Sequence, residues 1–265
     1  MNLNFHDTAS LNEFLMISFD SYNLSSTYLL VNRLNKSDTA ERDLQVEPLA
    51  FQDGFSLPTD FFRSRTIKIA GMIVADSASQ LGSSLDELKK NLVGVNKNLD
   101  VDYGSSTRRY KATLKSFQAP EDFYNITHLP YEAEFLCQPF GYGTQSINVS
   151  SDDVTGATKT VDVTVSGTYR PLPTITITFT SETGASAVSM TNNDTGDTIT
   201  ITTTLNASDI LVINCEEQKV TLNGTLIDFA GPIPLFQVGD NELAFSFPAT
   251  ARDVDIDIDY VPRYL

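Results

Sequence analysis

Hydrophobic and polar residues alternate with a period of two along much of this chain. Ile67, Ile69 and Gly71 alternate with Thr66, Lys68 and Ala70, a pattern that predicts a strand with one buried face. Beyond residue 143 short β-branched runs follow one another, turns are frequent and helix signals disappear, which predicts a β-sandwich. These runs are residues 161–165, 174–179, 198–202, 210–214, 219–222 and 225–228.

The last two of these runs are separated by Asn223 and Gly224 alone. Both residue types tolerate a positive φ, which is the backbone conformation that a tight two-residue β-turn requires. The dipeptide therefore predicts a β-hairpin at this point, with a short strand on each side of it.

One segment, at about residues 85–99, has the period of a helix instead. Apolar residues recur there at spacings of three and four, which places them on one stripe that packs against a sheet. Ser84 and Glu87 have the spacing of a capping box, in which the two side chains satisfy free N–H groups of the first turn. The stripe is Leu85, Leu88, Leu92, Val95 and Leu99.

The rest of the N-terminal half contains weaker strand signals and two expected breaks. The polar run 32–47 predicts a loop, and Gly54 to Pro58 predicts a turn. A second break at Pro139 to Gly143 marks an expected boundary between domains at residues 1–140 and 144–265. The fold class expected is therefore mainly β with one notable helix. The strands expected before the boundary are residues 15–19, 28–31, 100–103, 108–114 and 131–137.

The final residues predict two more strands, 239–247 and 253–260, before the chain ends at Arg263-Tyr264-Leu265. Asp253, Asp255, Asp257 and Asp259 alternate with apolar residues, so one face of the last long strand is a row of carboxylates. The row is a candidate site for a cation such as Ca²⁺. Same-face neighbours lie roughly 6.5–7 Å apart, and Ca²⁺ needs oxygens at about 2.3–2.6 Å. We therefore prefer a charged face that blocks edge-to-edge pairing, and we predict no metal.

The charge of the chain excludes some classes of partner. The formal net charge of the 265 residues is -16. Residues 141–265 hold 5 Lys and Arg against 16 Asp and Glu, so most of the excess lies in the C-terminal half. Nucleic-acid binding needs a basic footprint, which argues against sequence-specific recognition of DNA or RNA. Anionic membrane surfaces are disfavoured for the same reason. No apolar run is long enough to span a bilayer, and the N-terminus lacks a secretory signal, so we expect synthesis in a cytoplasm.

The sequence lacks the motifs of the common enzyme classes. It contains no Gly-rich phosphate loop, no serine nucleophile elbow and no Cys/His metal pattern. His6 and His128 lie in an N-terminal segment and a predicted loop, which disfavours a His-based triad or zinc site. Cys137 and Cys215 are interpreted as buried apolar residues in different domains. We expect no catalytic residue, no cofactor and no enzyme activity.

Two alternatives involving sugars remain open. Plentiful carboxylates are compatible with a glycoside hydrolase, although sugar clefts usually offer aromatic platforms and this chain has no Trp. Tyr142, Tyr169 and Tyr260 are candidate sugar or partner contacts, with a role in the core or its rim as the preferred interpretation. The second alternative is a carbohydrate-binding adhesin module that acts in recognition of a host surface.

Three stretches together resemble the distal tail protein (Dit) family of long-tailed bacteriophages, the siphophages. They are the strand Arg65 to Gly71, the segment Ser84 to Leu92, and the end of the chain from Gly239-Asp240-Asn241-Glu242-Leu243 to Leu265. The order of strand, helix, basic β-hairpin, sandwich and terminal Arg263-Tyr264-Leu265 covers nearly the whole chain. The resemblance implies an N-terminal split-barrel belt domain with a helix, and a C-terminal galectin-like or carbohydrate-module-like β-sandwich.

The resemblance also implies a function without chemistry. A Dit protein is a structural virion protein that forms a hexameric ring between the tail tube and the tail-tip hub. It anchors receptor-binding or side-fibre proteins, and DNA passes through its channel. The expected location is the phage tail tip, after synthesis in the host cytoplasm. The only basic cluster would then face a neighbouring protomer or an acidic partner, and it consists of Arg108, Arg109, Lys111 and Lys115.

Overall fold

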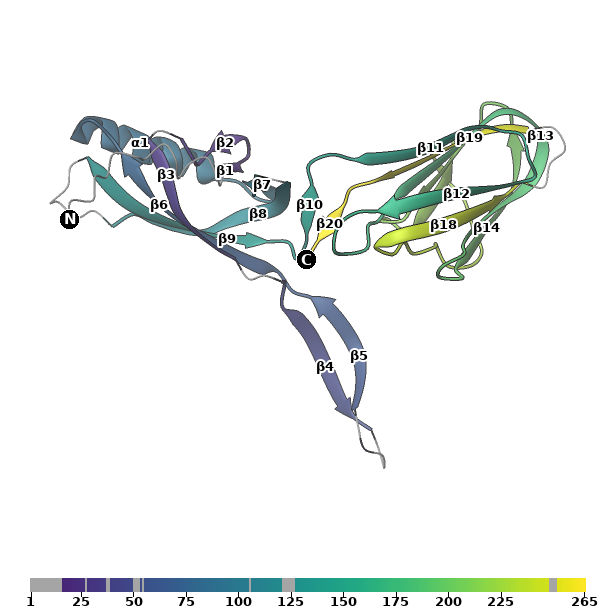
Figure 1. Cartoon of the computed structure of the whole chain (residues 1–265), viewed down its shortest axis with the longest axis horizontal. Coiled ribbons are helices and arrows are strands. Elements are labelled where there is room, and N and C mark those ends of the chain that lie inside the picture. The colour runs from purple at the N-terminus through teal and green to yellow at the C-terminus, as the bar shows by residue number, and fades with distance from the viewer. Residues whose placement is uncertain are drawn as a thin grey trace. The chain divides into compact units, whose positions relative to one another are not determined.

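The computed structural model describes residues 16–26, 28–36, 39–49, 53, 55–104, 106–120, 127–247 and 252–265. The chain divides into two compact units, Met1–Tyr142 with Leu265 and Gly143–Tyr264. The expected boundaries at 140 and 144 lie on either side of this division. His6 and Leu15 lie outside the described residues. Figure 1 shows both units, and each is described by itself below.

An antiparallel sheet with the strand order β2-β1-β7-β8-β9-β6-β3 forms the frame of the first unit. Its central ladder pairs β6 with β9 over ten residues, from Arg65 opposite Cys137 to Val74 opposite His128. His128 therefore begins a strand and does not lie in the expected loop. The strands are β1 (Met16–Phe19), β2 (Tyr22–Asn23), β3 (Leu29–Lys36), β6 (Arg65–Val74), β7 (Lys97–Asp102), β8 (Thr107–Gln118) and β9 (His128–Cys137), with the short β10 (Gly141–Gly143) after them.

The alternation around residue 67 forms the buried face of this sheet, as predicted. Every second residue of β6 is buried, and Ile67, Ile69 and Ile73 are fully enclosed. Gly71 lies on the same buried face. A Cβ at this position would lie 2.7 Å from the Tyr131 ring and would also collide with the carbonyl oxygen of Leu30. The glycine is thus required by close approach of its neighbours.

The single helix of the described residues, α1 (Ala78–Leu92), begins seven residues earlier than predicted and ends before Val95. Ser77, not Ser84, is the N-cap, and its Oγ accepts a hydrogen bond from the Gln80 N–H at 3.3 Å. Leu99 belongs to β7, where it is buried by the alternation of a strand. The apolar spacing of three and four residues that predicted the helix therefore continued by coincidence into the next element. Leu85, Leu88 and Leu92 do enter the core of the sheet.

The segment expected to be a loop and a turn is a long hairpin. Strands β4 (Arg42–Pro48) and β5 (Phe55–Phe62) pair as a separate two-stranded sheet, which we call the β4–β5 hairpin. Polar residues in the run 32–47 had predicted a loop, but the described side chains of β4 are mostly exposed on both faces, so the strand has no buried stripe to reveal it. Gly54 lies outside the described residues.

The second unit is a β-sandwich, and its two layers share the strand β13 (Thr174–Asn192). The first part of β13 pairs with β15 and β19 in the layer β11-β19-β13-β15-β16-β17. Its last part pairs with β14 and β18, and β18 also pairs with β12. The remaining strands of the sandwich are β11 (Ile147–Val154), β12 (Thr158–Val165), β14 (Thr198–Asn206), β15 (Ile210–Asn214), β16 (Lys219–Leu222), β17 (Thr225–Leu226), β18 (Gly239–Ser246) and β19 (Arg252–Tyr260). The short β20 (Arg263–Tyr264) follows them and belongs to neither layer.

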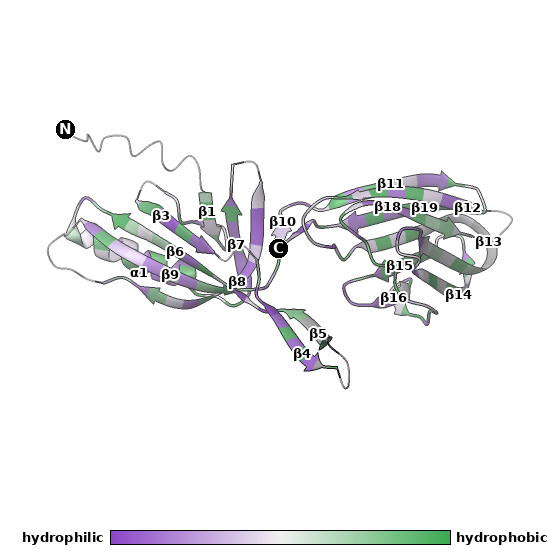
Figure 2. Cartoon of the chain, turned by 60° about the horizontal axis from the view of Figure 1, so that its bottom comes forward, coloured by the Kyte–Doolittle hydropathy of each residue, from purple (hydrophilic) through white to green (hydrophobic). Residues whose placement is uncertain are grey.

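Alternating residues from both layers meet in one apolar core, and Figure 2 shows the apolar and polar positions alternating along these strands. Asn223 and Gly224 form the predicted turn between β16 and β17, with φ of 50° and 79°. Two buried amides, Asn192 and Asn241, lie beside the core and are hydrogen-bonded to each other at 3.2 Å.

Strand β19 carries the row of Asp residues, and it corrects one expectation. It pairs with β11 on one side and β13 on the other, so it is an internal strand and its carboxylates do not protect an edge. Part of the row accepts hydrogen bonds from the neighbouring β11: Asn148 Nδ2 donates to Asp259 Oδ1 at 3.0 Å and to Asp257 Oδ1 at 3.4 Å. The predicted alternation itself is confirmed, since Val254, Ile256 and Ile258 are fully buried.

Candidate functional site

The basic cluster predicted on residues 108–115 lies on β8, where alternation divides it between two faces. Arg108 has the same parity as the buried Tyr110 and Ala112, whereas Arg109 and Lys111 point to the opposite face. Arg108 lies beside the Tyr103 ring, with its Cζ 5.4 Å from the ring centroid. The four cations therefore do not form one patch.

Arg109, Lys111 and Lys115 form polar contacts with neighbouring strands of the same sheet. Arg109 forms two hydrogen bonds of 2.8 Å with the Asp100 carboxylate, and this contact raises the pKa of Arg109. Lys111 Nζ donates to Asn98 Oδ1 at 2.8 Å. Lys115 Nζ lies 2.6 Å from Glu134 Oε1, and Lys68 Nζ lies 3.3 Å from Glu134 Oε2.

This pairing depresses the pKa of Glu134, chiefly through the hydrogen bond from Lys115. Each pair joins neighbouring strands of the sheet, so the cations contribute to cross-strand contacts as well as to surface charge. Any partner that uses these cations must compete with, or add to, the pairs inside the chain.

A buried cation that sequence reasoning missed lies at the start of β6. The Arg65 side chain is only 2% exposed, and its Cζ lies 5.6 Å from the Tyr110 ring centroid. Lys36 Nζ donates to Tyr110 Oη at 3.3 Å and lies 4.9 Å from the Tyr103 ring centroid. Burial raises the pKa of Tyr103. A single Arg before an alternating strand gives no sequence signal for burial, since Arg is almost never fully buried.

The β4–β5 hairpin exposes apolar side chains to an unusual degree. Among its described side chains, Phe61 is 68% exposed and Val46 is 58% exposed. Such residues gain nothing from folding of a single chain, and contiguous exposed apolar groups are typical of surfaces that a partner covers. The other large apolar side chains exposed here are Leu44, Leu49 and Phe55.

The three tyrosines considered for sugar contact differ in burial. Tyr260 is 2% exposed, and its Oη donates to the carbonyl of Thr164 at 2.9 Å, which argues against a contact role for its ring. Tyr142 belongs to the first unit and Tyr169 to the second, and both are half-buried. The Tyr169 ring has Arg263 Cζ at 5.5 Å and Arg170 Cζ at 5.8 Å from its centroid.

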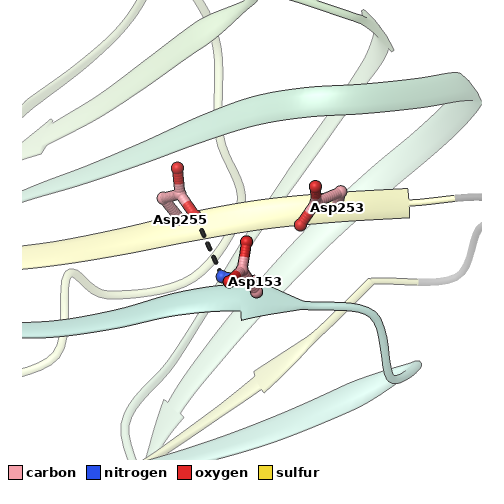
Figure 3. A group of neighbouring side chains, drawn as sticks. All are labelled: Asp153, Asp253 and Asp255. Carbon is pink, nitrogen blue, oxygen red and sulfur yellow. Dashed lines mark hydrogen bonds between the residues drawn. The ribbon is translucent and has the colours of Figure 1, made fainter.

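A second strand joins the row of Asp residues, which the sequence had not suggested. A bulge in β11 between Ser151 and Val154 brings Asp153 beside Asp253 and Asp255, with one carboxylate oxygen of each within 4.8 Å of the others (Figure 3). Asp255 accepts hydrogen bonds from the Asp153 N–H at 3.0 Å and from Thr180 Oγ1 at 3.4 Å. Asp253 Oδ1 is buried without a partner, although the side chain as a whole is partly exposed. Hydrogen bonds thus hold Asp255 in place without an ion.

The reactive residue types do not converge on any site in the described parts of the chain. Burial raises the pKa of both thiols, Cys137 and Cys215, to about 12, so neither is a nucleophile near neutral pH. His128 is exposed, and its Nδ1 lies 2.8 Å from Thr127 Oγ1. No helix of the described chain is both long and apolar enough for a membrane crossing.

Comparisons with known proteins agree with the architecture. Residues 166–264 match the model of the siphovirus-type tail component, C-terminal domain. No curated protein matches the sequence. Among solved structures, the Dit protein (gp 19.1) of phage SPP1, described as a paradigm of the hub adsorption apparatus in phages that infect Gram-positive bacteria, is similar with a TM-score of 0.67 and 16% identity. The alignment covers 95% of this chain and 99% of that one.

Two structures of the phage p2 baseplate in its activated conformation, with Sr and with Ca, align over 93% of this chain and 97% of theirs. Both are 8% identical to this chain, with TM-scores of 0.46 and 0.47.

Proposed function

We propose that this protein is a structural part of a phage tail tip, because residues 166–264 match the model of the siphovirus-type tail component, C-terminal domain, and the chain has the fold of SPP1 Dit. In finer detail we propose a hexameric ring that joins the tail tube to the tail-tip hub. The ring would anchor receptor-binding or side-fibre proteins and let DNA pass through its channel. Its proposed location is the virion, after synthesis in the host cytoplasm.

The single observation that carries this proposal is the extent of the fold match. The match to SPP1 Dit includes both units of the chain, with 95% of its residues aligned, and the family model independently matches residues 166–264. A sandwich alone hosts many unrelated functions, whereas a sandwich that follows this particular helix-bearing sheet is a more restrictive combination.

The β4–β5 hairpin supports assembly into a larger structure. An isolated two-stranded sheet is at best marginally stable in water, and this one carries exposed side chains such as Phe61 and Val46. Contact with another protomer or tail protein would remove these groups from water. The net charge of -16 also fits a DNA conduit, since an acidic wall repels phosphate.

We infer no catalytic activity, and the site residues support that inference. The two buried thiols and the exposed His128 lack the nucleophile–base geometry that acyl-transfer enzymes need. Direct sugar binding through Tyr260 is also disfavoured, because its side chain belongs to the core of the sandwich.

Native mass spectrometry of the purified full chain tests the assembly. We expect a species of six times the 29.1 kDa of one chain, with a central channel visible in negative-stain images. A protein that stays monomeric at all concentrations, both alone and with its tail-tube and hub partners, would contradict the ring. If that monomer bound glycans on an array, the adhesin-module alternative would replace it.

The basic residues of β8 remain our proposed ring contacts, and their separation between two faces makes the test more specific. Charge reversal at Arg108 and Arg109 together is expected to abolish the hexamer. The single variants R108E and R109E identify the responsible face, because the two side chains point in opposite directions. Hexamer mass unchanged in the double variant would exclude this interface.

A further inference from the structure

The Arg65 guanidinium is enclosed by the first unit and has no hydrogen-bond acceptor. Nε, Nη1 and Nη2 are each buried and without a partner, and the residue is 2% exposed. Arginine remains protonated in proteins, so the charge cannot be removed by loss of a proton. A buried charge is tolerated when it is paired with an opposite charge and hydrogen-bonded. The described chain supplies neither to Arg65.

The surroundings of Arg65 add positive charge and do not balance it. The Tyr110 ring has Arg65 Cζ at 5.6 Å and Lys36 Nζ at 5.8 Å from its centroid. Tyr103 lies next to Lys36, whose Nζ is 4.9 Å from the Tyr103 ring centroid, and its Oη is buried. Within the described part of the chain, neither Arg65 nor Lys36 forms an ion pair with a carboxylate. Contact with ring faces attracts a cation but offers no lone pair to its N–H groups.

These donors have the chemistry of an anion site. We propose that Arg65, Lys36 and Tyr103 bind one anionic oxygen ligand, either a small oxyanion such as phosphate or a carboxylate. The planar guanidinium presents parallel N–H groups that match two oxygens of such a ligand. The Lys36 ammonium adds a point charge, and the Tyr103 hydroxyl adds a donor. Lys36 and Tyr103 are half-buried, and we place the entry of the ligand on their side of Arg65.

Inorganic phosphate is the probe for the test, with thermal unfolding and calorimetric titration of the full chain as readouts. Ionic strength is held constant with sodium chloride, so a response reports preference for the oxyanion. We expect one phosphate per chain and an unfolding midpoint that rises with phosphate, as for any ligand that binds only the folded state. R65M, which keeps the volume and removes the charge, is expected to lose both the binding and the phosphate-dependent rise.

R33M is the matched control, because Arg33 lies on the same strand as Lys36 but is exposed. It removes one positive charge and should keep the full phosphate response, which separates the site from general effects of charge or salt. Without phosphate, R65M should unfold at the same temperature as the unaltered protein or higher, because it removes an unpaired buried charge. Equal phosphate responses in R65M and the unaltered protein would overturn the proposal.

If R65M fails to fold, K36M decides the question, because Lys36 is half-buried and tolerates substitution more readily. We expect about tenfold weaker phosphate binding in K36M, since a charge-assisted contact is lost. Unchanged affinity would overturn the site.

Acetate and assembled rings distinguish the two sources of the ligand. If acetate replaces phosphate on the single chain and rings no longer respond to either, a carboxylate of a neighbouring chain occupies the site in the assembly. If rings still bind phosphate, a free oxyanion is the ligand. This last comparison rests on the proposed ring, whereas the titration of the single chain does not, so failure of one is distinguishable from failure of the other.

Discussion

Arg109 and Asp100 face each other across the β7–β8 ladder, with Nε–Oδ1 and Nη2–Oδ2 distances of 2.8 Å. The two parallel hydrogen bonds fix the guanidinium plane, which ties a predicted interface residue to the sheet of its own chain. The pair is partly exposed, with side chains 34% and 23% accessible to solvent. It is therefore a modest contributor to stability and leaves part of each group available to a partner.

A double-mutant cycle measures this contact. We expect R109A and D100A to show a coupling free energy of about 0.5–1 kcal/mol, the range for partly exposed cross-strand pairs. Urea unfolding of the two single variants and the double variant gives the value. Additive effects of the two substitutions would mean that the pair contributes nothing to the stability of the fold. The coupling free energy should also fall at high salt, because salt screens exposed charges.

Apolar residues of the β4–β5 hairpin are expected to serve assembly and not the stability of the chain. The free energy of unfolding of the double variant V46S/F61S should differ by less than about 0.5 kcal/mol from that of the unaltered protein, because exposed positions contribute little to folding. The same variant should reduce the hexamer fraction in native mass spectrometry. L226S is the matched control: Leu226 is also 68% exposed but lies in the sandwich, and its removal should leave assembly intact. Equal loss of the hexamer in both would contradict a specific role for the hairpin.

The two serines considered as helix caps give a clear contrast. S77A should destabilise the protein by about 1 kcal/mol, since it removes the acceptor of the Gln80 N–H. S84A should change stability by less than about 0.5 kcal/mol, because Ser84 lies inside the helix and alanine is the better helix former. Chemical denaturation of both variants tests the position of the N-terminus, and a larger effect of S84A would contradict it.

Asn241 is a buried amide on which several backbone groups depend. Its Nδ2 donates to the carbonyls of Gly239 and Gln237 at 3.0 Å, and its Oδ1 accepts from the Gln237 N–H at 2.8 Å. We expect N241L to lower the free energy of unfolding by about 2–4 kcal/mol, because these backbone groups and the Asn192 amide would stay buried without their hydrogen-bond partner. Urea unfolding provides the measurement. Asn148, an exposed amide on β11, offers a comparison, and N148L should lower the free energy of unfolding by less than half as much.

The buried thiols predict slow alkylation and a dependence of stability on high pH. Cys137 and Cys215 have a pKa of about 12 in the folded chain, raised by burial from 9.0. In the unfolded chain they ionise near the ordinary value, so their stabilising contribution is complete below about pH 8.5 and is lost as pH rises towards 12. Iodoacetamide at pH 8 should label neither thiol until denaturant is added. Rapid labelling of the native protein would show that a thiol is accessible, and C137A and C215A assign the site.

Elements with one buried face were predictable from sequence, because side chains of a strand alternate between its faces. The alternation of Ile67 and Ile69 and the turn at Asn223-Gly224 identified real elements with nearly correct limits. The helix limits were wrong because Leu99 satisfies a helical spacing and a strand alternation at the same time. The β4–β5 hairpin was missed because the described side chains of β4 are mostly exposed on both faces, which leaves no periodic pattern to recognise.

The candidate sites were less predictable than the elements, because they depend on which strands become neighbours. The sequence by itself determined a mainly β chain, an acidic surface, two buried thiols and a resemblance to distal tail proteins, since these follow from local periodicity, composition and element order. Only the tertiary structure placed β19 inside a sheet and gave the cations of β8 their partners on β7 and β9. It also enclosed Arg65 beside Tyr110 and joined Asp153 to the Asp row. Each of these depends on strand pairing between residues far apart in the chain, and local patterns do not specify such pairing.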